Sequence, residues 1–311
     1  MKTNKRLLIA LVAILLLCIG LAIDAIVLRN RLSVLENDTD DYMILDTADP
    51  SESVLPGKKP AINAAQNPGT KDAVLEGIIE QELNGAGGNW DVWVEPLGNS
   101  MYAHMQSAGT HRMVSASLIK LFIMGTVYQA VDEGSIDNDD VYADIRNMIT
   151  ISDNDAANRL IRELGNGNEQ DGITRINQFA EDIGCMDTQM NRLMLENNGL
   201  ENYTSAEDCA KLLKLIYNGQ CINAKWSAEM MSIMKEQQVN DRIPQGLPRD
   251  VVVAHKTANL TNLANADVGI VFADNRPYII CIINNNSPDD TATNGQIAAL
   301  SEAVYDYYQT N

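Results

Sequence analysis

Apolar residues recur along the chain at two different spacings, and the change between them predicts where helices and strands lie. In the segment 71–83 an apolar residue falls at every fourth position, which is the spacing of one helix face. Over 90–94 apolar and polar residues alternate, the turn sequence PLGNS follows, and 101–105 runs back. We predict a β-hairpin here, because two short runs of strand-like pattern are joined by a glycine-containing turn.

The rest of the domain divides into a helical middle and a strand-rich end. From residue 117 to about 237 the pattern is mostly helical, and AEDCAKLLKLIYNG, preceded by a Thr-Ser N-cap signal, is a clear example. Three β-rich runs follow, VVVAHKTA, ADVGIVFA and PYIICIINN, separated by turn residues. The amphipathic segment NGQIAALSEAVYDYY predicts a closing helix.

Strands therefore lie at both ends of the domain, with helices between them. Strands from the two ends can share one antiparallel sheet, with the terminal helices on one face and the mostly helical block on the other. We therefore predict an α+β fold for residues 70–311.

Two segments at the N-terminus predict an attachment to a membrane. Residues 1–6 include the basic residues Lys2, Lys5 and Arg6, and residues 7–28 are apolar except for Asp24. An apolar run of this length is enough to cross a bilayer, and basic residues in front of it favour a cytoplasmic N-terminus. We predict a cytoplasmic tail (1–6), a transmembrane anchor (7–28) and an extracytoplasmic domain. The alternative is a cleaved signal peptide, for which no clear cleavage site follows the apolar run.

Residues 29–69 have the composition of a flexible linker. Seven acids fall between Glu36 and Glu52, and four of the nine prolines fall between Pro50 and Pro68. Clustered charge and proline with few apolar residues cannot form a packed core.

Composition excludes some partners. With 42 acidic and 23 basic residues the net charge is −19, and no basic stripe is present, so we expect no nucleic acid partner. The three His and five Cys have no metal-ligand spacing, so we expect no metal. Disulfides can form in exported sequence, and Cys185, Cys209, Cys221 and Cys281 allow three pairings. Cys281 stands in an apolar run and is alternatively a buried thiol.

Ser117 and Lys120 stand three positions apart at the start of an almost wholly apolar helical run. At this spacing two side chains share one helix face and can reach each other. Burial favours the neutral form of a lysine, which lets it accept a proton. The motif alone is weak, because Ser232 and Lys235 repeat it without companion motifs.

Two further motifs follow in order. Ser-Asp-Asn at 152–154 stands at the head of an amphipathic helix, and Lys-Thr-Ala at 256–258 lies in a β-rich run. Together with the segments ASLIKLFIM, SDNDAANRLI, ENYTSAEDCAKLL and DRIPQGLPRDVVVAHKT, these motifs resemble class A β-lactamase-related serine hydrolases. The resemblance runs from about Asn89 to the C-terminus and implies the β-lactamase/transpeptidase-like fold.

The resemblance also implies a role for each motif residue. Ser117 would be the acylated nucleophile and Lys120 its base, while Ser152 would pass the proton to the leaving nitrogen. Asn154 would hold the substrate amide or Lys120.

On the strand, Lys256 would attract the substrate carboxylate, and Thr257 would hydrogen-bond it. The backbone N–H groups of Ser117 and Asn259 would form the oxyanion hole. Because two ammonium groups near one serine repel, we expect Lys120 to lose its proton readily while Lys256 stays charged. His255, beside Lys256, is interpreted as a structural residue.

Three features depart from the family pattern. Ala258 replaces the glycine of the strand motif, and its methyl group could crowd the cleft. The interval between Ser117 and Ser152 is shorter than in typical class A enzymes. Family penicillinases carry a glutamate that activates the hydrolytic water, and here Glu196 is the candidate, although the pattern after it differs.

We therefore expect an extracytoplasmic serine hydrolase that hydrolyses β-lactams through a serine acyl-enzyme. It would act as a monomer on a small β-lactam or a cell-wall peptide, without a metal or organic cofactor. Two alternatives remain. One is a penicillin-binding-type D,D-peptidase or esterase with slow deacylation, and the other is a catalytically degenerate binding module.

Overall fold

The computed structural model describes residues 69–310, apart from 99–100, 108, 110 and 275. The predicted tail, anchor and nearly all of the linker lie outside the described residues. Within the described part of the chain, no helix has both the length and the apolar character needed to cross a membrane.

A six-stranded sheet forms the centre of the domain, in the order β1-β3-β2-β8-β7-β6. The hairpin strands are β2 (Asn89–Pro96) and β3 (Met101–Gln106). The C-terminal strands are β6 (Val252–Leu260), β7 (Ala264–Phe272) and β8 (Tyr278–Asn285). Because β2 pairs with β8 along its whole length, the two ends of the domain share one sheet, as predicted.

The sheet is antiparallel as predicted, except at one edge. The short strand β1 (Thr70–Lys71) pairs with β3 in parallel. A helix and a strand separate β1 from β3 along the chain, so no tight hairpin forces the two strands to run in opposite directions.

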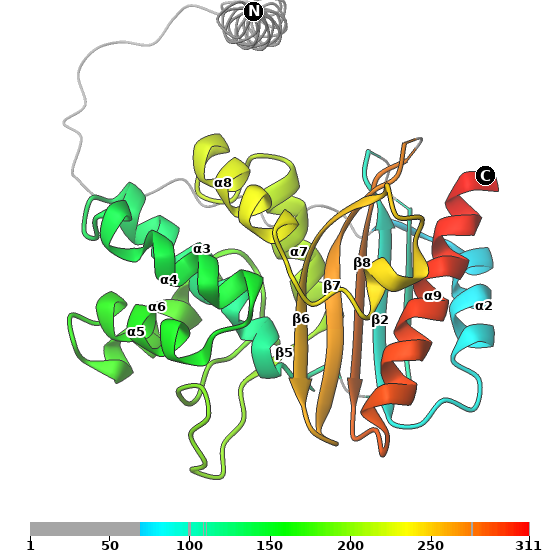
Figure 1. Cartoon of the computed structure of the whole chain (residues 1–311), viewed down its shortest axis with the longest axis horizontal. Helices are drawn as coiled ribbons and strands as arrows, with labels where there is room; N and C mark the ends of the chain where they lie inside the picture. The colour runs from blue at the N-terminus through cyan, green and yellow to red at the C-terminus, as the bar shows by residue number, and fades with distance from the viewer. Residues whose placement is uncertain (1–68, 99–100, 108, 110, 275, 311) are drawn as a thin grey trace, which may run out of the picture. The chain divides into compact units, whose positions relative to one another are not determined.

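Helices cover both faces of the sheet (Figure 1). The terminal helices α2 (Ala73–Glu82) and α9 (Asp290–Thr310) contact each other and enclose one apolar core. On the other face α7 (Ala206–Tyr217) packs against β2 and β8, and α8 (Ala224–Lys235) packs against β6. The predicted layer arrangement is therefore confirmed.

The helical block is built around α3 (Ile119–Asp132), which contacts the other three helices of the block and α8. Those three helices are α4 (Asn138–Thr150), α5 (Asn154–Leu164) and α6 (Glu169–Asp182). Of the 14 residues of α3, 11 are buried, and a helix surrounded in this way is apolar on every side. Lys120 is one of the buried residues.

The four cysteines of the described chain are all buried free thiols, so none of the three possible pairings occurs among them: Cys185, Cys209, Cys221 and Cys281. Burial raises the pKa of Cys209 and Cys221 to about 12, which keeps these groups as unreactive thiols. The alternative interpretation of Cys281 as a buried thiol is confirmed.

The close approach of α5 and α6 gives a test of the packing. At Gly172 a Cβ atom would lie 2.0 Å from the carbonyl oxygen of Ile161, whereas nothing lies within 4 Å at Gly77 of α2. We expect Gly172→Ala to lower the free energy of unfolding by about 1–3 kcal/mol through overpacking. Gly77→Ala should raise it by about 0.5–1 kcal/mol, because alanine favours a helix interior. Urea denaturation measures the free energy of unfolding of both variants. Equal changes in the two variants would contradict the close contact between α5 and α6.

Candidate active site

Ser117 lies in a strained turn in front of the buried helix. The 3₁₀ segment Ala116–Leu118 runs directly into α3, and Ala116 has a φ of 42°, in the left-handed region. A residue with a Cβ atom rarely adopts this conformation, and such strain is concentrated at functional sites. The turn leaves Ser117 half-buried, with its Oγ 3.2 Å from Lys120 Nζ.

Lys120 Nζ lies within hydrogen-bond distance of four oxygen atoms. The carbonyl oxygen of Ser152 and Oδ1 of Asn154 are each 2.7 Å away, and these oxygens can only accept. The hydroxyls of Ser152 and Ser117 lie at 3.1 and 3.2 Å. A neutral Lys120 amine has two N–H bonds, and it can donate one to the Ser152 carbonyl oxygen and one to Asn154 Oδ1. Its lone pair is then free to accept a proton from the hydroxyl of Ser117 or Ser152.

Burial makes the Lys120 amine available as a base. The side chain is fully buried, and burial lowers its pKa to about 7, while the nearby carboxylate of Asp153 opposes this shift. An amine with this pKa is neutral in a large fraction of molecules near neutral pH. Asn154 holds Lys120, which was one of its two predicted roles.

Ser152 connects the two lysines of the site. Its Oγ lies 3.1 Å from Lys120 Nζ and 3.0 Å from Lys256 Nζ. Its φ is 59°, which is again unusual for a residue with a Cβ atom. Because a hydroxyl donates one hydrogen bond and accepts two, Ser152 is able to relay a proton between an amine and a third group.

Lys256 reaches Ser152 from β6, the edge strand of the sheet. It is fully buried, and its Nζ also donates to the carbonyl oxygen of Thr257 at 2.7 Å. Burial lowers its pKa well below the usual value, and nearby Lys120 lowers it further. Burial therefore destabilises the charge on both amines, and the charged state of Lys256 stays a prediction.

Arg242, which the sequence analysis missed, adds a third cation. Its side chain is buried, with Nε donating to Asn265 Oδ1 and Nη1 to Asp241 Oδ1, both at 2.8 Å. Its positive charge also lowers the pKa of Lys256, so the two cations lie near each other. Arg242 stands in an irregular segment before β6, where neither periodicity nor a short motif marks it.

The other residues of the strand motif lie beside Lys256. Thr257 is almost completely buried, while Asn259 is exposed and its amide donates to Asp290 Oδ2 at 3.2 Å. Ala258 belongs to the apolar core on the helical-block side of the sheet. Because alternate residues of a strand face the same side, this methyl group lies on the face of β6 that carries Lys256.

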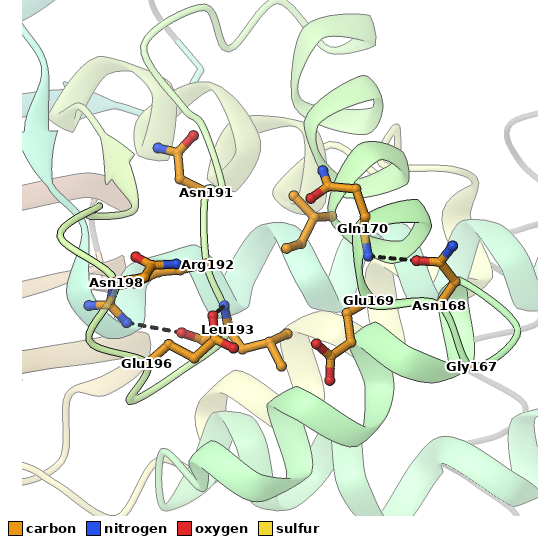
Figure 2. Close-up of a pocket in the computed structure, with 10 residues that line it drawn as sticks. Gly167, Asn168, Glu169, Gln170, Asn191, Arg192, Leu193, Glu196 and Asn198 are labelled. Carbon is orange, nitrogen blue, oxygen red and sulfur yellow. Dashed lines mark hydrogen bonds between the residues drawn. The ribbon is translucent and has the colours of Figure 1, made fainter.

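Glu196 does not join this cluster of residues. It lies in an exposed loop, and its carboxylate accepts the Leu193 N–H at 3.1 Å. It lines a separate pocket at the start of α6 (Figure 2), together with Gly167, Asn168, Glu169, Gln170, Ile173, Asn191, Arg192, Leu193 and Asn198. Within the described part of the chain, no hydrogen bond joins Glu196 to Ser117 or Lys120.

A different residue of this loop is attached to the active-site helix. Asn158 lies one turn after Asn154 on α5, and its side-chain amide makes two hydrogen bonds to the backbone of Met194, of 3.1 and 2.8 Å. The residue held against α5 is therefore a methionine, and a thioether cannot take up a proton in neutral water.

Fold and site together place the chain in the class of β-lactamase-related proteins. A serine on a strained turn, a buried amine beside it, and a second hydroxyl between two amines are the groups that acylation of a serine requires. The chain belongs to the beta-lactamase enzyme family, whose model matches residues 74–146 and 143–308.

Similar proteins agree with this assignment. The beta-lactamase of Streptomyces fradiae is 28% identical over 170 residues, covering 51% of this chain and 54% of the relative. That of Streptomyces albus G is 26% identical over 163 residues, with 50% of each chain covered. The chain thus spans about half the length of the curated relatives it matches.

Solved structures show the same fold. PBP-A superimposes with a TM-score of 0.70 at 24% identity, covering 79% of this chain and 100% of that one. The TLA-1 extended-spectrum beta-lactamase gives a TM-score of 0.68 at 19% identity, with coverage of 76% and 98%.

The charge of Asp153 provides a test of the Lys120 environment. Asp153 caps α5 by accepting the Ala156 N–H, and its charge raises the pKa of Lys120. Asparagine caps a helix equally well, so we expect Asp153→Asn to keep the fold and to lower the Lys120 pKa below about 7. Titration of the lysine Nζ by NMR measures the shift. The matched control is Asp155→Asn in the same turn, and an equal shift in both variants would contradict the assignment.

Proposed function

We propose that the protein forms an acyl-enzyme at Ser117 with β-lactams and related cell-wall acyl compounds, and that it releases the acyl group slowly. The observation that carries this proposal is the Lys120 amine, which lies 3.2 Å from Ser117 Oγ with two acceptor-only oxygens to bind its hydrogens. A base at this position can take the serine proton as the C–O bond forms.

The protons balance along the chain of hydrogen bonds. Ser117 Oγ attacks the amide carbonyl carbon while its proton moves to Lys120. When the C–N bond breaks, Ser152 Oγ donates its proton to the leaving nitrogen and regains one from the Lys120 ammonium. The net result is one proton transferred from Ser117 to the leaving group, with Lys120 neutral again. The backbone N–H groups of Ser117 and Asn259 are the proposed donors to the oxyanion.

The cations on the strand side favour a substrate with an anionic group. Lys256 and Arg242 are both buried, and each loses hydration that a carboxylate could replace. A carboxylate in this position would also stabilise the charged form of Lys256. This supports a substrate that carries a carboxylate close to the scissile amide, as penicillins do.

Slow release is supported by the loop that contains Glu196. A deacylation base must reach a water molecule beside the acyl carbonyl, and the Glu196 carboxylate instead accepts a backbone N–H of its own loop. The residue attached to α5 is Met194, which cannot act as a base. We therefore favour the penicillin-binding activity over rapid β-lactam hydrolysis.

The named relatives support the second candidate function, rapid β-lactam hydrolysis, because the Streptomyces proteins are beta-lactamases. Under that alternative Glu196 would turn towards Ser117 when substrate binds. The third possibility, a binding module without turnover, is disfavoured because hydrogen bonds connect Ser117, Lys120, Ser152 and Lys256 in one continuous series.

Two substrates separate these functions. A fluorescent penicillin should label the extracytoplasmic domain and remain bound for minutes or longer, whereas a chromogenic cephalosporin should be turned over only slowly. Ser117→Ala should abolish both signals. Fast cephalosporin turnover that falls in Glu196→Gln would establish the beta-lactamase instead, and absence of any label on the folded domain would refute acylation at Ser117.

The pH dependence tests the role of Lys120. Because the neutral amine is the base and its pKa is about 7, acylation should be fastest above pH 7 and should fall about tenfold per unit below it. Stopped-flow labelling with the fluorescent penicillin gives this profile. Lys120→Arg keeps a positive charge that cannot be lost, and should slow acylation by about 10²–10⁴-fold at every pH. A flat profile in the unmodified protein would exclude Lys120 as the base.

We also propose that the domain lies outside the cytoplasm on a membrane anchor. The support is the apolar run 7–28 behind a basic tail. Protease added to intact cells should digest the domain, while a version without residues 1–28 should be protected inside the cell. Protection of the full chain would overturn this location.

A further inference from the structure

We propose that His255 and Asp267 form a positioning pair that holds Arg242 beside Lys256 and so helps to bind the anionic group of the substrate. This inference rests on the acylation function proposed above. It goes beyond the structural role expected for His255, because the pair would influence the reaction without reaching the reacting atoms.

The pair is built into the two strands next to the site. His255 precedes Lys256 on β6, and Asp267 lies opposite Thr257 on β7. Both side chains are buried, at 1% and 0% exposure. Gly269 stands directly opposite His255, where a Cβ atom would come 2.6 Å from the histidine Cβ, so the glycine makes room for the imidazole.

The hydrogen bonds fix the protonation of the ring. Nδ1 lies 2.9 and 3.1 Å from the two oxygens of Asp267, and Nε2 lies 3.0 Å from Asn240 Oδ1. The orientation of Asn240 is set by its Nδ2, which donates to the carbonyl oxygen of Gln237 at 3.3 Å. Oδ1 has no proton to donate, so Nε2 must carry one. Asp267 also accepts the Ile243 N–H at 3.1 Å, so its carboxylate joins the ring to the segment that carries Arg242.

These contacts hold the segment that carries Arg242. Asn240, before Arg242, accepts from His255, and Ile243, after Arg242, donates to Asp267. The side chain of Arg242 is itself bound to Asn265, which is on β7 as well. Arg242 is therefore fixed on both sides in the chain and through its own guanidinium, next to the strand that presents Lys256.

The pair lies among the charged groups around Lys256. These are Asp267 on β7, Arg242 and Asp241 in the preceding segment, and Lys120 on α3. Asp267 makes its hydrogen bonds to His255 and Ile243, and the carboxylate bound to Arg242 is that of the exposed Asp241. An anionic ligand would therefore stabilise the charged form of Lys256 beside an Arg242 that the pair holds in place.

The ring protonation can be measured without any substrate. In ¹⁵N NMR spectra of the intact domain, we expect Nε2 of His255 to carry a proton, with the signal assigned by its loss in His255→Gln. A His255 ring without a proton on Nε2 would overturn the proposal, whatever the catalytic activity of the protein.

The kinetic test compares free and esterified carboxylates. For acylation by benzylpenicillin, we expect His255→Gln to raise the half-saturating concentration about tenfold while the maximal rate stays within about threefold. For the methyl ester of benzylpenicillin, which lacks the anionic group, variant and original protein should differ by less than about twofold. Equal losses for acid and ester, or no loss for either, would overturn the proposal.

A matched control is available near the opposite edge of the sheet. His104 on β3 is bound to buried Asp91 at 2.9 Å, so His104→Gln also breaks a His–Asp contact. His104→Gln should leave unchanged the ratio between the half-saturating concentrations of benzylpenicillin and of its methyl ester. If His255→Gln does not fold, Asn240→Ala removes the acceptor of the Nε2 proton, together with one hydrogen bond to Gln237, and should give a smaller change of the same kind. If the original protein is not acylated at all, the acylation function fails, while the NMR result still decides the protonation of the pair.

Discussion

Two buried lysine amines lie within hydrogen-bond distance of one hydroxyl. The rest of the fold has to offset the free energy that burying these two amines costs. Lys120 and Lys256 are fully excluded from water, and the Ser152 Oγ lies within 3.1 Å of both. Like charges so close cannot both be stable in a low-dielectric interior. At least one amine therefore tends to lose its proton, and a neutral amine is the base that the proposed acylation of Ser117 needs. The chemistry follows from burial of charge more than from any single contact.

The architecture brings these groups together from three separate elements. The buried helix α3 contributes Lys120, the turn before α5 contributes Ser152, and the edge strand β6 contributes Lys256. Two of the backbone positions involved, Ala116 and Ser152, have left-handed φ values that cost free energy on their own. The large apolar core around α3 stabilises both, because relaxing either turn would displace buried side chains. Strain at the site is therefore maintained by packing at a distance from it.

Much of this could be predicted because it is local in sequence. The spacing of apolar residues determined the helices and strands, and the ordered motifs identified Ser117, Lys120, Ser152 and Lys256. Contacts between distant segments were not predictable in the same way. Arg242 and the attachment of Met194 to Asn158 depend on which irregular segments meet, and no periodic pattern encodes that. Glu196 was placed by its position in sequence, but the direction of a carboxylate in an exposed loop depends on backbone hydrogen bonds that only the fold determines. The four free thiols likewise follow from packing and not from spacing.

The charge of the whole chain and the charge of the site have opposite signs, and this limits how a substrate is recognised. The net charge is −19, so an anionic ligand is repelled at long range by the average surface. In physiological salt this repulsion is screened beyond about 8 Å, and it therefore does little to the approach of a small molecule. At the proposed anion site, the side chains of Lys256 and Arg242 are buried and screened much less, so attraction acts only over the last few ångströms. Under this proposal, selectivity for an anionic group arises from replacing the hydration of these two side chains. Their positions, and hence the residues that hold Arg242, then decide binding.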